Sequence, residues 1–365
     1  MFSFNGLSLK IGELTARIPI IQGGMGVGIS LSRLASAVAD CGGIGVISAA
    51  GIGMLEKDFA RNFLEANLRA LRNEIRKAKE KTKGILGVNI MVAMSNFAEM
   101  VKTAIEEKID IIFAGAGLPL SLPSFLGEER GTKLVPIVSS ARAIGLIAKK
   151  WIKKYDYVPD AVVVEGPMAG GHLGFSNEQL TNSEFALERL VVEVADEVKK
   201  IEDETGKSIP VIAGGGLYTG DDIYRITRIG ASGVQMATRF VTTDECDASD
   251  DFKKSYISCK KEDIVIINSP VGMPGRAIIN DFLRDVEKGL KKPYKCPFHC
   301  IETCDFKKSP YCIALALMNA KMGKFEHGFA FAGVNAHRAN EIIPVEKLMK
   351  TLAQEYNEAI QAGYN

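Results

Sequence analysis

One histidine stands in a setting suited to proton transfer, at the end of an apolar run. The segment 161–175 reads AVVVEGPMAGGHLGF, so valines lead into Glu165 and then into a glycine loop that carries His172. Adjacent glycines let the backbone approach a ligand where a Cβ atom would clash. An imidazole there can take up or supply a proton near neutral pH. We predict that His172 is catalytic; the alternative is a loop histidine bonded to backbone.

Glu165 and further glycine loops could hold a phosphorylated cofactor. Glu165 either orients a cofactor hydroxyl or His172, or is a solvated loop carboxylate. The loops 214–216 and 236–238 each follow an apolar run, and free backbone N–H groups in such loops bind phosphate. A third loop, 22–28, spaces its glycines as G-x-G-x-G, and the chain has no G-x-x-x-x-G-K-[ST] motif. Rossmann and P-loop sites are therefore excluded on spacing.

The cysteines are concentrated in one segment. Four of the seven lie within 17 residues, at Cys296, Cys300, Cys304 and Cys312. This density in a chain without secretory features suggests a metal rather than disulfides, and four thiolates suit zinc or an iron–sulfur cluster. The spacing matches no Cys-x2-Cys template, so a group of buried free thiols remains the alternative.

Apolar strands that alternate with helices would position these residues. The predicted strands are 18–21, 44–47, 85–91, 109–113, 133–138, 161–164, 210–213 and 233–237. Such strands imply a parallel sheet covered on both faces. Eight units over about 240 residues match an α/β fold of the (β/α)8 TIM-barrel type, which binds ligands at its strand ends. A doubly wound open sheet is the competing fold.

Three regions follow from this pattern: a barrel at residues 1–244, a C-terminal cap at 245–340 that carries the cysteine-rich segment, and a terminal helix at 341–365 that packs back on the barrel. In the cap, 263–268 is predicted as a strand and 277–289 as a helix. The charged segment 55–83 is predicted as one helix or two on the outside of the barrel.

Composition limits the classes of partner. Lys and Arg total 45 and Asp and Glu total 44, a balance that provides no electrostatic footprint for nucleic acid or an anionic membrane. No charge-free run is long enough to span a membrane, and the N-terminus lacks the pattern of a signal peptide. We expect a cytoplasmic protein with a small-molecule substrate, and leave a monomer and a homodimer open.

Five motifs stand in order at the predicted strand ends: PIIQGGM at 19–25, GVNIM at 87–91, AGAG at 114–117, GGH at 170–172 and PVIAGGG at 210–216. Together they resemble the FMN-dependent nitronate monooxygenases, formerly called 2-nitropropane dioxygenases, which are related to the flavin-type enoyl-ACP reductases. The resemblance implies an FMN-bearing TIM barrel with His172 beside the flavin. The expected cofactor contacts are Gln22, Gly23, Gly24, Met25, Asn89, Glu165, Gly171, Gly214, Gly215, Gly216, Gln235, Met236, Ala237 and Thr238. This chain differs from the family's usual Glu-Ala-Gly-Gly-His-Arg-Gly in the added Pro167 and Met168 and in Leu173.

The predicted function is oxidation of alkyl nitronates with O2 by an FMN-dependent oxidoreductase. The first alternative is reduction of an enoyl thioester with NAD(P)H as electron donor. A flavin- or phosphate-binding barrel without turnover is a third reading. The four cysteines suggest a fourth, an iron–sulfur flavoprotein that passes electrons through the cap.

Overall fold

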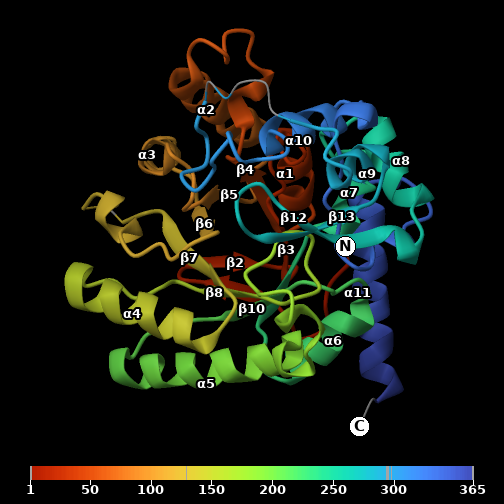
Figure 1. Cartoon of the computed structure of the whole chain (residues 1–365). Helices are drawn as coiled ribbons and strands as arrows, with labels where there is room; N and C mark the ends of the chain where they lie inside the picture. The colour runs from red at the N-terminus through yellow and green to blue at the C-terminus, as the bar shows by residue number, and fades with distance from the viewer. Residues whose placement is uncertain (1, 129, 293–295, 297, 364–365) are drawn as a thin grey trace.

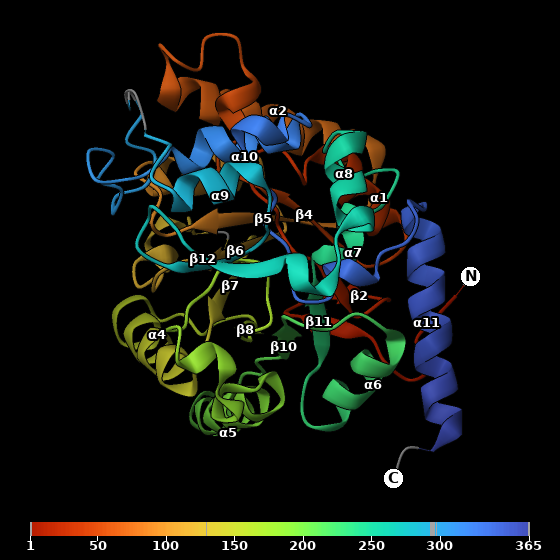
Figure 2. The ribbon, with the colours of Figure 1, turned by 45° about the vertical axis from the view of Figure 1, so that its right-hand side comes forward.

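Eight parallel strands form a closed barrel in the order β10-β11-β3-β4-β5-β6-β7-β8 (Figure 1; Figure 2). The computed structural model describes residues 2–128, 130–292, 296 and 298–363. The barrel strands are β3 (Ile20–Gln22), β4 (Ile44–Ser48), β5 (Ile85–Met91), β6 (Ile111–Gly115), β7 (Lys133–Val138), β8 (Val162–Glu165), β10 (Val211–Gly214) and β11 (Gly233–Met236). The predicted (β/α)8 barrel is confirmed. The open sheet is wrong, because β10 pairs with β8 and β11 with β3.

Helices on the outside of the barrel follow most of these strands. They are α1 (Ser32–Asp40), α2 (Phe63–Lys81), α3 (Phe97–Glu106), α4 (Ala141–Tyr155), α5 (Leu187–Thr205), α6 (Gly220–Arg228) and the short α7 (Thr238–Val241). Side-chain caps begin two of them, since the hydroxyls of Ser140 and Thr219 accept from backbone N–H groups in the first turns of α4 and α6. The helix predicted over 55–83 begins only at Phe63, because residues 56 and 58 lie in turns and their carboxylates pair with Arg69.

A hairpin that the sequence pattern did not reveal fills the amino-terminal end of the barrel. Its strands are β1 (Leu9–Ile11) and β2 (Leu14–Ala16). Leu9 and Ile11 are fully buried and pack in one cluster with barrel residues such as Phe113. These contacts close the end of the barrel opposite to the strand carboxyl ends.

The last helix, α11 (Val345–Ala362), packs against α6 and α1 and runs along the side of the barrel (Figure 1). Helix α11 takes the place of the covering helix after β11, because α7 has only four residues and is too short to cover the barrel there. The N-terminal segment packs on it as well, because the ring of Phe4 lies 4.9 Å from that of Tyr356 and Asn357 donates to the carbonyl of Ser3. Both ends of the chain therefore contribute to the outer layer.

The described part of residues 245–340 adds three α-helices and two strands, which join β9 (Gly171–His172) in a second sheet, at the carboxyl ends of the barrel strands. The sheet has the order β12 (Ile264–Asn268), β13 (Pro274–Ile278) and β9. The helices are α8 (Asp250–Ser258), α9 (Asp281–Glu287) and α10 (Ile313–Lys321). The predicted helix over 277–289 is wrong at its start, because residues 274–278 pair with β12 and Asn280 caps a helix that begins at Asp281. In the described part of the chain no helix has the length and hydrophobicity that crossing a membrane requires.

Leu9→Ala should lower the free energy of unfolding by about 2–5 kcal/mol, because it leaves a void in the closed end of the barrel. Urea unfolding followed by circular dichroism measures this loss. Leu290→Ala is the matched control, since Leu290 is 68% exposed and its truncation should change stability by less than about 0.5 kcal/mol. Equal effects of the two substitutions would contradict the role of the hairpin.

Candidate active site

Two adjoining hollows lie at the carboxyl ends of the barrel strands. The main cavity has a volume of about 460 Å³, and a smaller hollow beside it has about 70 Å³. Both are lined by Glu165, Gly170, Gln235, Ala237, Thr238 and Gly333. The two hollows thus share a wall formed by the ends of β8 and β11. Volumes of this size are typical of sites for small molecules and cofactors.

Most of the residues predicted as cofactor contacts line one hollow or the other. The main cavity is bordered by Gly23, Gly24, Met25, Asn89, Glu165, Gly171, His172, Gln235, Ala237 and Thr238. The smaller hollow adds Gly215, Gly216 and Met236. Gln22 and Gly214 line neither. The side chain of Gln22 is fully buried, where it accepts from the N–H of Val46 and donates to the carbonyl of Gly23.

Close packing explains why glycines occupy two of these positions. A Cβ atom on Gly24 would lie 2.4 Å from the Cβ of Asn89, so this loop can cross the end of β5 only without a side chain. A Cβ atom on Gly170 would lie 2.5 Å from the backbone of Ala332. Each glycine therefore lets a loop reach its neighbour.

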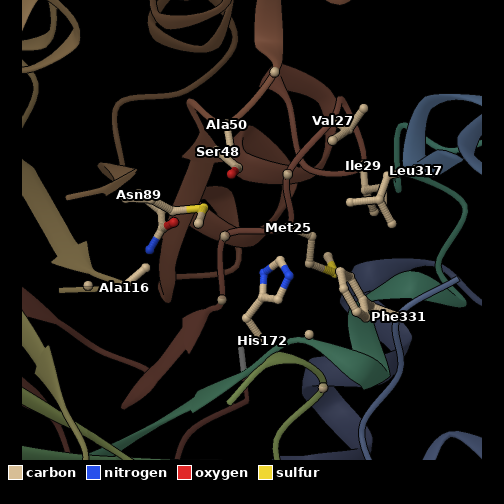
Figure 3. Close-up of a pocket in the computed structure, with 18 of the residues that line it drawn as sticks. Met25, Val27, Ile29, Ser48, Ala50, Asn89, Ala116, His172, Leu317 and Phe331 are labelled. Atoms are coloured by element: carbon tan, nitrogen blue, oxygen red, sulfur yellow. The ribbon is translucent and has the colours of Figure 1, made fainter. Parts of the chain in front are cut away.

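His172 projects into the main cavity from β9. Figure 3 shows its imidazole in the space that Met25, Asn89 and Phe331 also border. Its Nε2 atom lies 2.7 Å from the hydroxyl of Ser269, and its ring meets that of Phe331 edge-on at 4.9 Å. Burial lowers the pKa of His172 to about 4, so the imidazole is neutral at physiological pH.

Glu165 borders both hollows, at the end of β8. Burial raises its pKa to about 7, because few polar groups replace the water that an ionised carboxylate would need. A freely solvated carboxylate would keep its ordinary value near 4.5. Burial of this kind is at odds with a solvated loop carboxylate, and the other predicted role, orientation of a cofactor hydroxyl or of His172, stays a prediction.

A buried arginine clamps the loop that leads to His172. Arg276 on β13 donates from Nη1 to the carbonyls of Pro167, at 2.7 Å, and Ala169, at 2.5 Å. The same strand pairs with β9, so Gly275 lies opposite His172. Burial lowers the pKa of Arg276 to about 10, and no ion pair joins it to a carboxylate within the described residues. The added residues Pro167 and Met168 are thus held by the cap.

The cysteine-rich segment contributes one thiol to the wall. Cys300 lines the main cavity, whereas Cys296, Cys304 and Cys312 do not, and all four are free. The pKa of Cys300 rises to about 12, first through burial and then through the neighbouring thiols. Over the described residues, no three His, Cys, Asp or Glu side chains are arranged to hold a metal ion. The predicted zinc or iron–sulfur centre is therefore not supported by the described residues.

Several residues of the site have no local sequence signal. Ser269 and Arg276 reach the histidine loop from about a hundred residues away, in a stretch that reads only as a glycine- and proline-rich turn. Aromatic rings from distant segments form the far wall of the main cavity, with Phe298 stacked on Phe63 and tilted against Phe59. The small-residue loop at 329–338 supplies Gly333 and Asn335 to the smaller hollow.

Comparison with known proteins places these features in a wider group. The model of the nitronate monooxygenase family matches residues 8–355. A Mycobacterium tuberculosis protein named (3aS,4S,5R,7aS)-5-hydroxy-7a-methyl-1-oxo-octahydro-1H-indene-4-carboxyl-CoA dehydrogenase is 28% identical over 75% of this chain, which spans just under two thirds (66%) of that relative. A "probable nitronate monooxygenase" of Staphylococcus saprophyticus is 27% identical over 77% of this chain and 81% of its own length. FabK from Thermotoga maritima has a similar structure, with 28% identity, a TM-score of 0.72 and 94% of each chain covered.

His172→Ala should weaken the pH dependence of stability on the acid side. The pKa of His172 is about 4 in the folded chain and 6.5 in the unfolded chain. Between pH 6.5 and pH 4 the unfolded chain therefore binds a proton at this residue, whereas the folded chain does not. Wild-type stability therefore falls as the pH drops from about 6.5 to about 4, and the variant should lose less. Urea unfolding of the cofactor-free protein across this window measures the difference.

Glu165→Gln provides a control of opposite sign. The folded chain keeps the Glu165 proton up to a pH of about 7, whereas the unfolded chain loses it near 4.5. Wild-type stability should therefore fall relative to this variant as the pH rises through that window. Stability curves that run parallel for the wild type and both variants would contradict the burial of these two groups.

Proposed function

Because the chain belongs to the nitronate monooxygenase family of flavin oxidoreductases, we propose that it is an FMN-dependent enzyme whose substrate lies against His172. The reaction proposed is reduction of an enoyl thioester with NAD(P)H. The observation that carries this choice is the largely apolar lining of the main cavity, which includes no lysine or arginine among the described residues.

The two hollows fit the two ends of FMN. The N–H groups of Gly215, Gly216, Leu217 and Ala237 make no backbone hydrogen bond within the described residues, and all four residues line the smaller hollow. Free N–H groups that converge in this way bind phosphate. The apolar main cavity, with Met25 and Asn89 beside His172, suits a planar ring system.

Bound FMN would supply the transfer of a hydride or of electrons, which no side chain of the site can perform. The neutral His172 would take part in proton transfer to the substrate. In the tautomer with its proton on Nδ1, the hydroxyl of Ser269 donates to Nε2, and Nδ1–H is free to donate to a substrate carbonyl oxygen. The enclosing residues of the cap would exclude water from this exchange.

The charge of the lining distinguishes the candidate substrates. Among the described residues of the main cavity, Glu165 is the one carboxylate, and there is no lysine or arginine. A nitronate anion would find no cation there to compensate for its desolvation, because His172 is neutral. A neutral thioester requires no counter-charge, and the wall of Phe59, Phe63 and Phe298 can take its apolar chain.

Oxidation of an alkyl nitronate with O2 is the second candidate. It is favoured by the match to the nitronate monooxygenase family and by the similarity to the staphylococcal relative. The enoyl thioester reaction draws its support from the similarity to FabK, an enoyl-ACP reductase, over nearly the full length of both chains. Both reactions would use the same histidine and the same flavin position.

Anaerobic mixing of the FMN-loaded protein with single reductants separates the two reactions. We expect NADH or NADPH to bleach the flavin absorbance, and an enoyl thioester added afterwards to restore it. A nitronate should leave the absorbance unchanged, because the cavity offers no positive charge to hold it. Bleaching by a nitronate alone would reverse the choice, and protein that takes up no FMN would remove both candidates.

Ser269→Ala should lower kcat by about tenfold or more, because His172 loses the hydrogen bond that sets its tautomer and orientation. Ser269→Thr keeps a hydroxyl and should recover part of this loss. Ser124→Ala, on an exposed serine that bonds only to a local carbonyl, is the control and should leave kcat unchanged. Steady-state kinetics with NAD(P)H and an enoyl thioester measure the effect. Unchanged kcat in Ser269→Ala would remove this serine from the proposal.

A further inference from the structure

Two arginines lie over one buried tyrosine at the outer edge of the smaller hollow. The guanidinium carbons of Arg239 and Arg338 are each 4.4 Å from the centre of the Tyr218 ring. The ring belongs to a side chain that is only 5% exposed. Leu217 and Thr238, which precede Tyr218 and Arg239 in the chain, both line the smaller hollow. Arg239 therefore follows a residue of the wall directly in the chain, and Arg338, which is exposed, lies three residues after Asn335 of the same wall, although neither arginine lines the hollow itself.

Neither arginine is neutralised by a carboxylate within the described residues. Other arginines of the chain have partners, such as Arg69 with Glu56 and Arg225 with Asp222, but no ion pair or side-chain hydrogen bond joins Arg239 or Arg338 to another group. Because both lie 4.4 Å from the same ring centre, their charges are within twice that distance of each other and repel. The cation–π contacts with the tyrosine offset only part of this repulsion.

Asp222, four residues after Tyr218 in the chain, has its charge engaged elsewhere. Asp222 accepts from the backbone N–H groups of Tyr218 and Thr219 and pairs with Arg225. Burial is the largest single effect and raises its pKa, but the hydrogen bonds with Thr219, Tyr218 and Arg225 together lower the pKa below its ordinary value. Glu165 lines the hollow as well, but it makes no ion pair with either arginine and burial raises its pKa, so an anion from outside the chain would balance the two arginines.

The smaller hollow has the size and the donors that such an anion needs. Its volume of about 70 Å³ is several times the roughly 10–15 Å³ that one water molecule requires, which is enough for a phosphoryl group. The N–H groups of the 215–217 loop have no backbone acceptor within the described residues and would be available to an anion. Asn335 donates to the carbonyl of Gly216 at 2.6 Å, which holds this loop beside the segment that carries Arg338.

We propose that Arg239 and Arg338, held in place by Tyr218, supply the positive charge of a phosphate monoester site at the smaller hollow. The phosphate would come either from FMN or from the 2′-phosphate of NADPH. Where it comes from FMN, the inference rests on the proposed function. The arginines act on the phosphate by charge, so their contribution is absent from ligands that lack it.

The test compares FMN with riboflavin, which has the same ring system and no phosphate. Flavin fluorescence on titration with cofactor-free protein gives the two dissociation constants for the wild type, Arg239→Gln, Arg338→Gln and the double variant. We expect FMN to bind at least tenfold more weakly to the double variant, with less dependence on salt, and riboflavin to bind as to the wild type. Arg189→Gln, which breaks an exposed pair with Glu193 on α5, is the matched control and should change neither constant.

Two further variants separate the ring from general stability. Tyr218→Phe keeps the ring beneath both guanidinium groups and should retain FMN affinity. Tyr218→Leu removes the ring and should reproduce the loss seen in the double arginine variant. Circular dichroism verifies that each variant is folded before its affinity is compared.

The remaining outcomes identify the source of the phosphate or overturn the site. Unchanged FMN binding with weaker binding of NADPH, but not of NADH, supports the site and assigns it to the nucleotide. Equal losses for FMN and riboflavin, or no loss for FMN or NADPH, overturn it. If the wild type binds neither flavin, the proposed function fails, and inorganic pyrophosphate then decides the arginine site. If pyrophosphate raises the Tm of the wild type more than that of the double arginine variant, the arginine site is supported. Equal rises in Tm for the two proteins would overturn the site.

Discussion

Closure of the parallel barrel is the constraint on which the rest of the structure depends. Because β10 pairs with β8 and β11 with β3, the carboxyl ends of all eight strands meet around one rim. Every loop after a strand is thereby directed to the same space, and the β1–β2 hairpin closes the other end. The two hollows exist because small residues at the rim let these loops approach one another without filling it.

The rim alone does not complete the site. Strand β13 pairs with the two residues of β9, and Arg276 binds the loop that precedes them, so the position of His172 depends on contacts from the cap. Ser269, in the turn between β12 and β13, gives the imidazole its hydrogen bond. The apolar surroundings that lower the pKa of His172 and raise that of Glu165 also come in part from the cap. The groups that we propose for the chemistry and for substrate selection therefore border the same cavity.

Local pattern predicted the barrel and the loops at its rim, but not the contacts that complete the site. Runs such as 161–164 are apolar and rich in valine, and each observed barrel strand begins and ends within two residues of its prediction. Strand β9 has two residues, Gly171 and His172, too few for any periodicity, and Arg276 acts through backbone carbonyls that carry no sequence signal. The sequence shows that four cysteines lie close together at 296–312, whereas their arrangement in space depends on tertiary packing.

The clamp on the histidine loop has a consequence for how the molecule is made. Arg276 lies 109 residues after Pro167, the first carbonyl that it binds. During synthesis from the N-terminus, the barrel strands up to β11 leave the ribosome before Arg276 does. The loop that precedes His172 therefore lacks its hydrogen-bond donor until Arg276 has also emerged. A nascent chain can thus form much of its scaffold before the loop that carries the proposed catalytic histidine is held in place, so completion of this loop is a late step of folding.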